Sequence, residues 1–462
     1  MSIFNSDLRL GEITSILKDV KGSVRFIGIL GSGMYPLARI LLGRGYSVCG
    51  YDRNFQSAKP GVRGEMRICP YTEADLDDVS LAVYSLAIDE IDPELRAIRE
   101  LGIPLISRAQ LLGALMSEAK VRISVSGSHG KSTTTAIIDH ILTAAGKEHT
   151  AVSGAALSSG ESYSDGGGEI FLAEACEYKD SFLRLCPTHQ IITSVELDHT
   201  DYFSSLDDIR ASFLTAAERA QVTVINRDDE VSATIIDELI ARGKKPITYG
   251  KDSSADYRLW DIERDGELTR FTVSHGCKTI RLSTSLIGEY NLYNITAAVA
   301  LSRTLGIESE AITNAVSAFR PIDRRLSHIA DFRGVPILYD YAHHPSELLA
   351  VITALKERYG SVTVIFRPHT YSRTASLWRY FISALCKADF TILLDIYPAR
   401  EKAIDGITSQ NLAKFIPGAV AASESEAAEI ALSHPSRVIA LLGAGDVEAV
   451  KGDLIALSKK HV

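Results

Sequence analysis

The 462-residue sequence is too long for one hydrophobic core, and its length predicts about three domains. Apolar residues make up 46% and charged residues 23% of the chain, which is typical of a globular protein. The formal net charge of -9 argues against a nucleic-acid partner. No apolar run approaches the roughly 18 residues of a membrane span, and the N-terminus lacks a basic region followed by an apolar run. We therefore expect a cytoplasmic protein that binds neither membrane nor nucleic acid.

The cysteines carry no metal-binding or disulfide pattern, because they are scattered, form no C-x-x-C pair and have no histidine at zinc spacing. We expect reduced thiols that are mostly buried. The six are Cys49, Cys69, Cys176, Cys186, Cys277 and Cys386.

The first part of the chain alternates strands and helices, which predicts a parallel sheet. A buried strand over 24–33 enters a glycine turn, a helix follows over 35–42, and a second strand over 47–51 ends at Asp52. Gly28, Gly31 and Gly33 give the spacing G-x-x-G-x-G, which departs from the dinucleotide fingerprint. This turn either binds a pyrophosphate or is a structural tight turn. Further strands are expected over 81–84 and 103–106, with a helix over 93–101 between them.

The segment 121–146 is typical of a phosphate-binding loop between a strand and a helix. Gly127 and Gly130 let backbone N–H groups turn toward phosphate oxygens, Lys131 supplies a cation, and Ser132 or Thr133 offers a hydroxyl to Mg²⁺. The strict P-loop pattern is not met, because a valine stands at the position of its first glycine. The alternative is a glycine turn followed by a surface lysine.

Two further strands of the central region are followed by residue types that can bind a metal ion. A glycine-rich segment of low order over 158–168 precedes a strand over 170–173 that ends at Glu174. A strand over 190–197 runs into Asp198-His199-Thr200-Asp201. Beside a phosphate loop, such strand ends hold the magnesium of a nucleotide, so Glu174 and His199 are metal candidates. A structural role near a helix N-terminus is the alternative for His199.

A strand over 222–226, a β-rich region over 257–286 and an alanine-rich helix opening at 288–294 complete the central region. Asn291 and Asn294 lie three residues apart on one face of this helix, where they could contact a base or a phosphate. Helix capping is the alternative for both.

Four successive strands of the last region end in polar clusters, which predicts the ligand edge of an open parallel sheet. The strands are expected over 335–340, 362–366, 390–394 and 438–442, and the clusters are 340–345 (DYAHHP), 367–373 (RPHTYSR), 395–398 (DIYP) and 443–446 (GAGD).

Together with FIGILGSGM over 26–34, SGSHGKSTTT over 126–135 and EACEYKDSFL over 174–183, these motifs resemble the Mur ligase family, most nearly its L-alanine-adding branch. The likeness covers nearly the whole chain. It implies an α/β protein of three domains: an N-terminal Rossmann-like UDP-sugar domain over 1–112, a central P-loop-type ATPase domain over 113–318, and a C-terminal Rossmann-like domain over 319–462.

The resemblance also implies ATP-dependent ligation in peptidoglycan precursor synthesis, the pathway that supports cell shape and division. The lactyl carboxylate of UDP-N-acetylmuramate would be activated as an acyl phosphate, and a small amino acid, L-alanine, would displace phosphate. ATP and Mg²⁺ are the implied cofactors, and the protein would be a monomer or homodimer.

The family's site residues can be placed on this sequence motif by motif. The implied catalytic residues are Lys131, Glu174, His199, Arg325 and His343, and the implied metal ligands are Ser132, Glu174 and His199. The implied ATP-binding residues are Gly127, Ser128, His129, Gly130, Lys131, Ser132, Thr133, Asn291, Asn294, Arg325 and Asp340. The implied substrate-binding residues are Gly28, Gly31, Ser32, Gly33, Met34, Asp52, His199, His343, His369 and Arg373.

Four positions depart from the family's usual residues: Leu30 replaces a glycine, Ser128 a threonine, Cys176 an aspartate and Thr370 an arginine. Losing a carboxylate and a cation favours a change of acceptor over a change of chemistry. The alternatives are therefore a paralogue with another acceptor, such as a ligase that recycles murein tripeptide, and a catalytically silent Mur-like partner protein. An oxidoreductase that uses the N-terminal glycine turn would leave Lys131 without a role.

Overall fold

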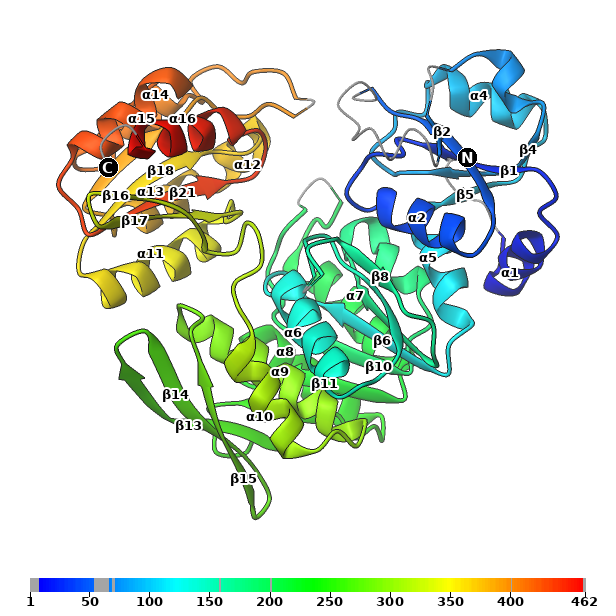
Figure 1. The fold of residues 1–462 in the computed structure, drawn as a ribbon, viewed down its shortest axis with the longest axis horizontal. Coiled ribbons are helices and arrows are strands. Elements are labelled where there is room, and N and C mark those ends of the chain that lie inside the picture. Colours follow the sequence, from blue (N-terminus) through cyan, green and yellow to red (C-terminus); the bar gives the residue numbers. More distant parts are fainter. Residues whose placement is uncertain are drawn as a thin grey trace. The chain divides into compact units, whose positions relative to one another are not determined.

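The computed structural model describes residues 8–53, 66–68, 71–157, 159–199, 202–399 and 401–459. The chain divides into two compact units, each of which is described by itself. The first contains Met1–Thr284 and Tyr293–Phe319, and the second contains Ser285–Leu292 and Arg320–Val462. Figure 1 shows helices packed against the sheets of both units. Within the described residues, no helix is long and apolar enough to cross a membrane.

The first sheet of the first unit has the strand order β3-β2-β1-β4-β5, and all its neighbouring strands run parallel. Both faces are buried, since Phe26 of β1 points into one apolar cluster and Ile27 into another. This explains why the strand is continuously apolar. The elements are α1 (Leu10–Lys18), β1 (Ser23–Ile27), α2 (Tyr35–Gly43), β2 (Ser47–Tyr51), β3 (Arg67–Ile68), η2 (Glu73–Leu76), β4 (Val79–Tyr84), α4 (Pro93–Glu100), β5 (Leu105–Ser107) and α5 (Arg108–Ser117).

The second sheet has the order β15-β14-β13-β12-β11-β10-β6-β9-β7-β8. Its strands from β13 to β7 run parallel, and the hairpins at both edges are antiparallel. Strand β6 lies between β9 and β10, so the residues after it emerge between two strand ends. The strands are β6 (Val121–Ser126), β7 (His149–Val152), β8 (Tyr163–Asp165), β9 (Ile170–Glu174), β10 (His189–Ile192), β11 (Val222–Asn226), β12 (Ile247–Gly250), β13 (Tyr257–Asp265), β14 (Leu268–His275) and β15 (Lys278–Thr284).

The helices of this central region are α6 (Lys131–Ala144), η3 (Tyr178–Arg184), α7 (Leu206–Arg219), α8 (Glu230–Ala241), α9 (Glu289–Thr304) and α10 (Ser309–Ala318). Of these, η3, α7 and α8 contribute to an apolar cluster that they share with the first sheet.

The sheet of the second unit has the order β16-β17-β21-β18-β19-β20, and only β16 runs antiparallel to its neighbour. Helices α11 and α13 contribute to the apolar cluster on one face, and α15 and α16 to that on the other. The elements are β16 (Ser327–Phe332), β17 (Val335–Asp340), α11 (Pro345–Tyr359), β18 (Val362–Arg367), α12 (Tyr371–Ser376), α13 (Trp378–Leu385), β19 (Phe390–Leu393), α14 (Ser409–Ala413), β20 (Ala419–Ala421), α15 (Glu424–Ser433), β21 (Val438–Gly443) and α16 (Glu448–Lys459).

These three sheets with parallel strands confirm the predicted α/β class. The strand predicted over 190–197 is too long, because β10 ends at Ile192. After it the Thr193 N–H donates to the carbonyl of Ser126, the last residue of β6, over 3.0 Å, and the Ser194 carbonyl accepts from the Ser128 N–H over 2.8 Å. The chain after Ile192 therefore passes from the end of β6 to the loop that follows it. Of the tetrapeptide after this strand, residues 200 and 201 lie outside the described part.

Two smaller expectations are also corrected. The glycine-rich segment over 158–168 contains β8, which pairs antiparallel with β7. The cysteines are not mostly buried: of the five described, Cys49 is buried, Cys176 and Cys186 are partly exposed, and Cys277 and Cys386 are exposed. All five are free thiols, and residue 69 lies outside the described part.

Candidate active site

The loop after β6 requires glycine at both of its glycine positions. Gly127 has φ 137°, and a Cβ atom there would lie 1.9 Å from Thr193 Oγ1. Gly130 has φ 81° and caps α6, and a Cβ atom there would lie 2.4 Å from Asn294 Oδ1. Since L side chains rarely adopt these φ values, the loop takes this path only with glycine at 127 and 130. Helix α6 therefore starts directly at Lys131.

The middle of the loop is fastened to the segment that follows β10. The Ser128 hydroxyl accepts from the Glu196 N–H over 2.8 Å, and the His129 N–H donates to Ser194 Oγ over 3.2 Å. The His129 ring also lies 3.4 Å from the Glu196 carboxylate. Because the N–H groups of 128 and 129 already have protein acceptors, a phosphate here would be bound by the N–H groups of the first turn of α6. Ser132 and Thr133 lie in that turn and are buried.

Lys131 lies in this turn with its ammonium group enclosed by acceptors. Its Nζ donates to the carbonyl oxygens of Gly127 and Ser128 and lies 3.0 Å from the carboxylate of Glu177. Burial lowers the pKa of Lys131, but the nearby Glu177, Cys176 and Glu174 together raise it above its ordinary value. The lysine is therefore a fixed cation rather than a surface side chain.

His199, one of the predicted metal ligands, lies near the same carboxylate. His199 Nε2 is 3.7 Å from Glu177 Oε1, and the His199 ring packs 4.8 Å from that of Tyr178. His199 has φ 53°, an uncommon conformation for a residue other than glycine. Glu174 ends β9, and its Oε2 accepts from Ser153 Oγ over 3.1 Å and from the Gly154 N–H over 2.8 Å.

The two asparagines of α9 make different contacts. Asn291 donates from Nδ2 to the carbonyl of Ile287 over 2.8 Å, which is a contact with the chain just before the helix. Asn294 instead lies beside Gly130 of the loop. Both side chains are buried. The structure thus places Asn294 against the loop that follows β6.

The N-terminal glycine turn is braced by the acidic residue at the end of β2. The Leu30 N–H donates to Asp52 Oδ2 over 3.0 Å, and Gly28 has φ 82°. A Cβ atom on Gly33 would lie 2.9 Å from the Arg108 side chain. Ser32 is exposed on the turn, Gly31 donates to the Gly28 carbonyl, and Met34 is buried beneath it.

In the second unit, Asp340 is held at the end of β17 by backbone donors. The Leu326 and Ala342 N–H groups each donate to one of its carboxylate oxygens over 2.8 Å. Burial raises the pKa of Asp340 to about 6, although the charge of nearby Arg325 opposes this shift. The Arg325 guanidinium lies 5.9 Å from the Tyr341 ring.

A histidine cluster follows β17 and β18. His343 Nδ1 lies 3.0 Å from the carbonyl of Tyr341, and the His343 ring is 6.0 Å from that of His369. His369 stacks on Tyr397 at 5.5 Å, and Arg373 Nη1 lies 3.3 Å from His369 Nδ1. The structure thus brings His343, His369 and Arg373 together within this unit.

Comparison with known proteins identifies the family. Three Mur ligase models match the chain: "Mur ligase family, catalytic domain" over residues 23–120, "Mur ligase middle domain" over 125–302, and "Mur ligase, glutamate ligase domain" over 324–447. A UDP-N-acetylmuramate–L-alanine ligase of Lachnospira eligens is 38% identical, covering 85% of this chain and 87% of the relative. One of Syntrophus aciditrophicus is 31% identical, covering 98% and 97%. The chain belongs to the Mur ligase family.

Solved structures show the same fold. The Thermotoga maritima UDP-N-acetylmuramate-alanine ligase MurC has a TM-score of 0.80 at 23% identity, covering 95% of this chain and 99% of that one. A murein peptide ligase from Psychrobacter arcticus has a TM-score of 0.69 at 20% identity, covering 96% and 99%.

The positions that depart from the usual Mur ligase residues have clear local roles. Cys176 lies close enough to Lys131 and Glu177 to feel their charges, and burial raises the pKa of its thiol, so it remains neutral where an aspartate would be charged. Thr370 has φ 65°, and its hydroxyl accepts from the Arg373 N–H at 3.4 Å, which caps α12. Leu30 uses its backbone rather than its side chain to bind Asp52.

Three residues near the Mur ligase site were missed from the sequence. Glu177 lies three residues after Glu174, a spacing that could have drawn attention to it. Arg108 packs against Gly33, and its charge acts on the Cys176 thiol, but a lone arginine at a helix start carries no sequence signal. Tyr397 lies in the DIYP cluster over 395–398, but its stacking on His369 could not be predicted from the sequence.

Proposed function

We propose that this Mur ligase joins L-alanine to the lactyl carboxylate of UDP-N-acetylmuramate and converts ATP to ADP and phosphate in the same reaction. The observation that carries this proposal is the glycine-bounded loop whose lysine is enclosed beside Glu177. Relatives named as UDP-N-acetylmuramate–L-alanine ligases, 31% and 38% identical over most of the chain, support the choice of substrates.

The proposed reaction has two steps. A carboxylate oxygen of the sugar's lactyl group attacks the γ-phosphorus, ADP leaves, and an acyl phosphate forms. The amine of L-alanine then attacks the acyl carbon and loses a proton, and inorganic phosphate leaves as the amide forms. Phosphoryl transfer depends on positioned cations more than on a covalent nucleophile, and Lys131 supplies such a cation.

The donor set beside Lys131 fits Mg²⁺. Ser132 offers a hydroxyl, Glu174 a carboxylate and His199 an imidazole, and hard divalent cations take oxygen ligands together with water. We assign Ser132 and Glu174 as direct ligands and His199 as a ligand or as an acceptor for a bound water. The ion would neutralise charge on the phosphates. Glu174 is oriented by two donors, and His199 Nε2 lies 3.7 Å from Glu177 Oε1.

The remaining assignments follow the same proposal. The glycine turn over 28–34 would hold the UDP-sugar, with Asp52 bracing the turn from behind. His343, His369 and Arg373 would line the acyl and amino-acid side, and Arg325 and Asp340 would contact ATP. The proposed domains are 1–112, 113–318 and 319–462. ATP and UDP-sugars are cytoplasmic compounds, so we place the enzyme in the cytoplasm.

A second candidate acceptor, a murein tripeptide, is favoured by one observation. Thr370 caps α12 where an arginine would offer a second cation for a small amino acid's carboxylate.

The test is phosphate release with ATP, Mg²⁺ and UDP-N-acetylmuramate against L-alanine, glycine, L-serine and the tripeptide. L-Alanine should give the highest kcat/KM, and Lys131→Ala should abolish turnover while the fold is kept, because its charge stabilises the transferring phosphate. Preference for the tripeptide would move the chain to the recycling reaction. No release with any acceptor would make it a silent partner protein.

A further inference from the structure

The segment after β7 holds the Glu174 carboxylate in one orientation. Both donors, the Ser153 hydroxyl at 3.1 Å and the Gly154 N–H at 2.8 Å, bind the same oxygen, Oε2. Ser153 is only 2% exposed, so water does not compete for this bond. Among the described residues, Oε1 receives no hydrogen bond.

The Ser153 hydroxyl is itself held in place. The Ala155 N–H donates to Ser153 Oγ over 3.2 Å, and the Ser153 N–H donates to the carbonyl of Ser162 over 2.9 Å. A hydroxyl that accepts an N–H directs its own hydrogen elsewhere, and the acceptor within reach is Glu174 Oε2. Ser153 therefore acts as a fixed donor.

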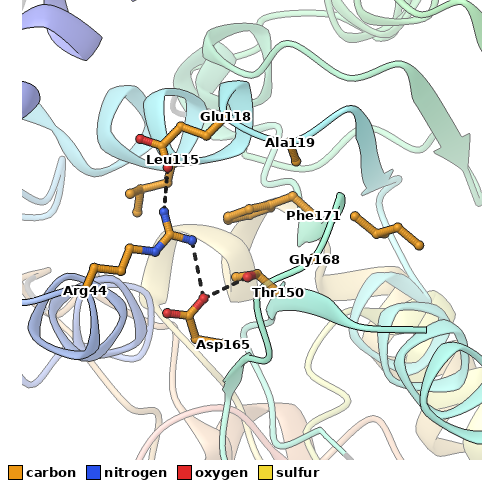
Figure 2. A pocket seen from close by; sticks show the side chains of 10 residues that line it. Arg44, Leu115, Glu118, Ala119, Thr150, Asp165, Gly168 and Phe171 are labelled. Atoms are coloured by element: carbon orange, nitrogen blue, oxygen red, sulfur yellow. Dashed lines mark hydrogen bonds and ion pairs between the residues drawn. The ribbon is translucent and has the colours of Figure 1, made fainter. Parts of the chain in front are cut away.

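The outer end of the same hairpin is tied to the first sheet's helices. Thr150 donates to Asp165 over 2.8 Å, and Arg44 lies 3.3 Å from Asp165 and 2.7 Å from Glu118. Figure 2 shows these side chains around a cavity of about 360 Å³, with Phe171 on its wall. Arg44 follows α2 and Glu118 follows α5, so these contacts anchor the outer end of the hairpin to two helices. The contact of Ser153 with Glu174 anchors its other end.

We propose that Ser153 is a positioning residue for the divalent cation: together with the Gly154 N–H it occupies Oε2 of Glu174 and leaves Oε1 as the oxygen that binds the ion. This inference rests on the proposed function, because that function makes Glu174 a metal ligand. Residues that orient a ligand in this way change metal affinity by about tenfold or more when they are lost.

The experiment measures Mn²⁺ binding to the full chain by the electron paramagnetic resonance signal of free Mn²⁺, with a non-hydrolysable ATP analogue present. Ser153→Ala should raise the Kd for Mn²⁺ about tenfold. Ser153→Thr keeps the hydroxyl and should bind as the wild type does. Ser164→Ala is the matched control, since its hydroxyl lies on β8 without a hydrogen-bond partner among the described residues. An unchanged Kd in Ser153→Ala would overturn the proposal.

Two more variants keep the result decisive. Gly154→Ala adds a Cβ atom 3.1 Å from Glu174 Oε1, so it should also weaken Mn²⁺ binding and serves if Ser153→Ala does not fold. Glu174→Gln separates the two proposals. If Glu174→Gln weakens binding and neither Ser153→Ala nor Gly154→Ala does, only the positioning role fails. If Glu174→Gln binds Mn²⁺ normally, the assignment of Glu174 as a ligand fails, and the inference fails with it.

Discussion

The Nζ atom of Lys131 lies 3.0 Å from Oε2 and 3.1 Å from Oε1 of Glu177, whose side chain is 1% exposed. Such a pair is nearly neutral as a whole, so the phosphates of ATP would approach a lysine whose charge is already partly balanced by Glu177. His199 lies 3.7 Å from the same carboxylate. Glu177 therefore binds the cation of the loop and lies close to the histidine of the proposed metal site.

Replacing Glu177 should impair the chemical step more than ATP binding. Glu177→Gln removes the nearest charge that keeps the pKa of Lys131 raised and frees the ammonium group to move. We expect kcat for phosphate release to fall about a hundredfold, in the range of losing one charge-stabilising group. Glu169→Gln is the control, since its ion pair with Lys120 is exposed. A kcat within threefold of the wild type would show that Glu177 only fills space.

His199 should matter most for the metal. His199→Ala is expected to raise the Mg²⁺ concentration needed for half-maximal activity about tenfold while changing the KM for L-alanine little, because a lost ligand or its partner weakens the metal first. The measurement is initial rate against free Mg²⁺ at saturating substrates. His328→Ala removes an exposed histidine of β16 and should leave both constants unchanged. Equal Mg²⁺ dependence in all three proteins would give His199 a purely structural role.

Asp340 should make the second unit less stable as the pH rises. Its folded pKa of about 6 exceeds its ordinary value of 3.8, so the folded state binds the proton more tightly. This contribution to stability is fully present below pH 3.8 and is lost as the pH rises through about 6. At 1.36 kcal/mol per pKa unit, the difference between about 6 and 3.8 corresponds to about 3 kcal/mol.

Urea unfolding at pH 4.5 and pH 7 measures this effect. In Asp340→Asn the loss of stability between the two pH values should shrink, because no carboxylate has to ionise in the buried site. Asp453→Asn, an exposed change on α16, should keep the wild-type difference. The pH argument fails if Asp340→Asn loses as much stability as the wild type does.

Thr370→Arg should strengthen binding of the acceptor and destabilise the start of α12. An added guanidinium could bind the carboxylate of L-alanine beside Arg373, and a charge-assisted bond worth about 1.5 kcal/mol would lower KM about tenfold. The cap that the Thr370 hydroxyl provides to α12 would be lost, at a cost of about 1 kcal/mol. Thr370→Gln loses the cap without adding charge. If both variants have the same KM, position 370 does not contact the acceptor.

The strands were predictable where their apolar runs end in turns. The ranges expected for β11 and β17 agree with the structure at both ends, because each run is buried and followed by polar residues. The strand expected at β10 was too long, because the backbone of Thr193 bonds to the last residue of β6 and that of Ser194 to the loop after it. Such bonds depend on a partner about 65 residues away, which a local pattern does not contain.

The part of the site that could be predicted from the sequence is the loop around Lys131, because its residues form a local motif. The strand, the glycines and the helix around Lys131 were all predicted from the sequence. The spacing of Glu177 from Glu174 was a possible signal, but its pairing with Lys131 could not be predicted, because the two residues are 46 positions apart. The helical spacing of the two asparagines of α9 was visible in the sequence, but the contact of Asn294 with Gly130 was not, because these two residues are far apart in the chain.

The stack of His369 on Tyr397 depends on a residue without a side chain. Gly445 has φ 103°, and a Cβ atom there would lie 2.8 Å from the Tyr397 ring. Any other amino acid would displace that ring, and the histidine that rests on it would move in turn. A library randomised at position 445 and selected for growth should therefore return glycine alone, even though this position contacts no reacting atom.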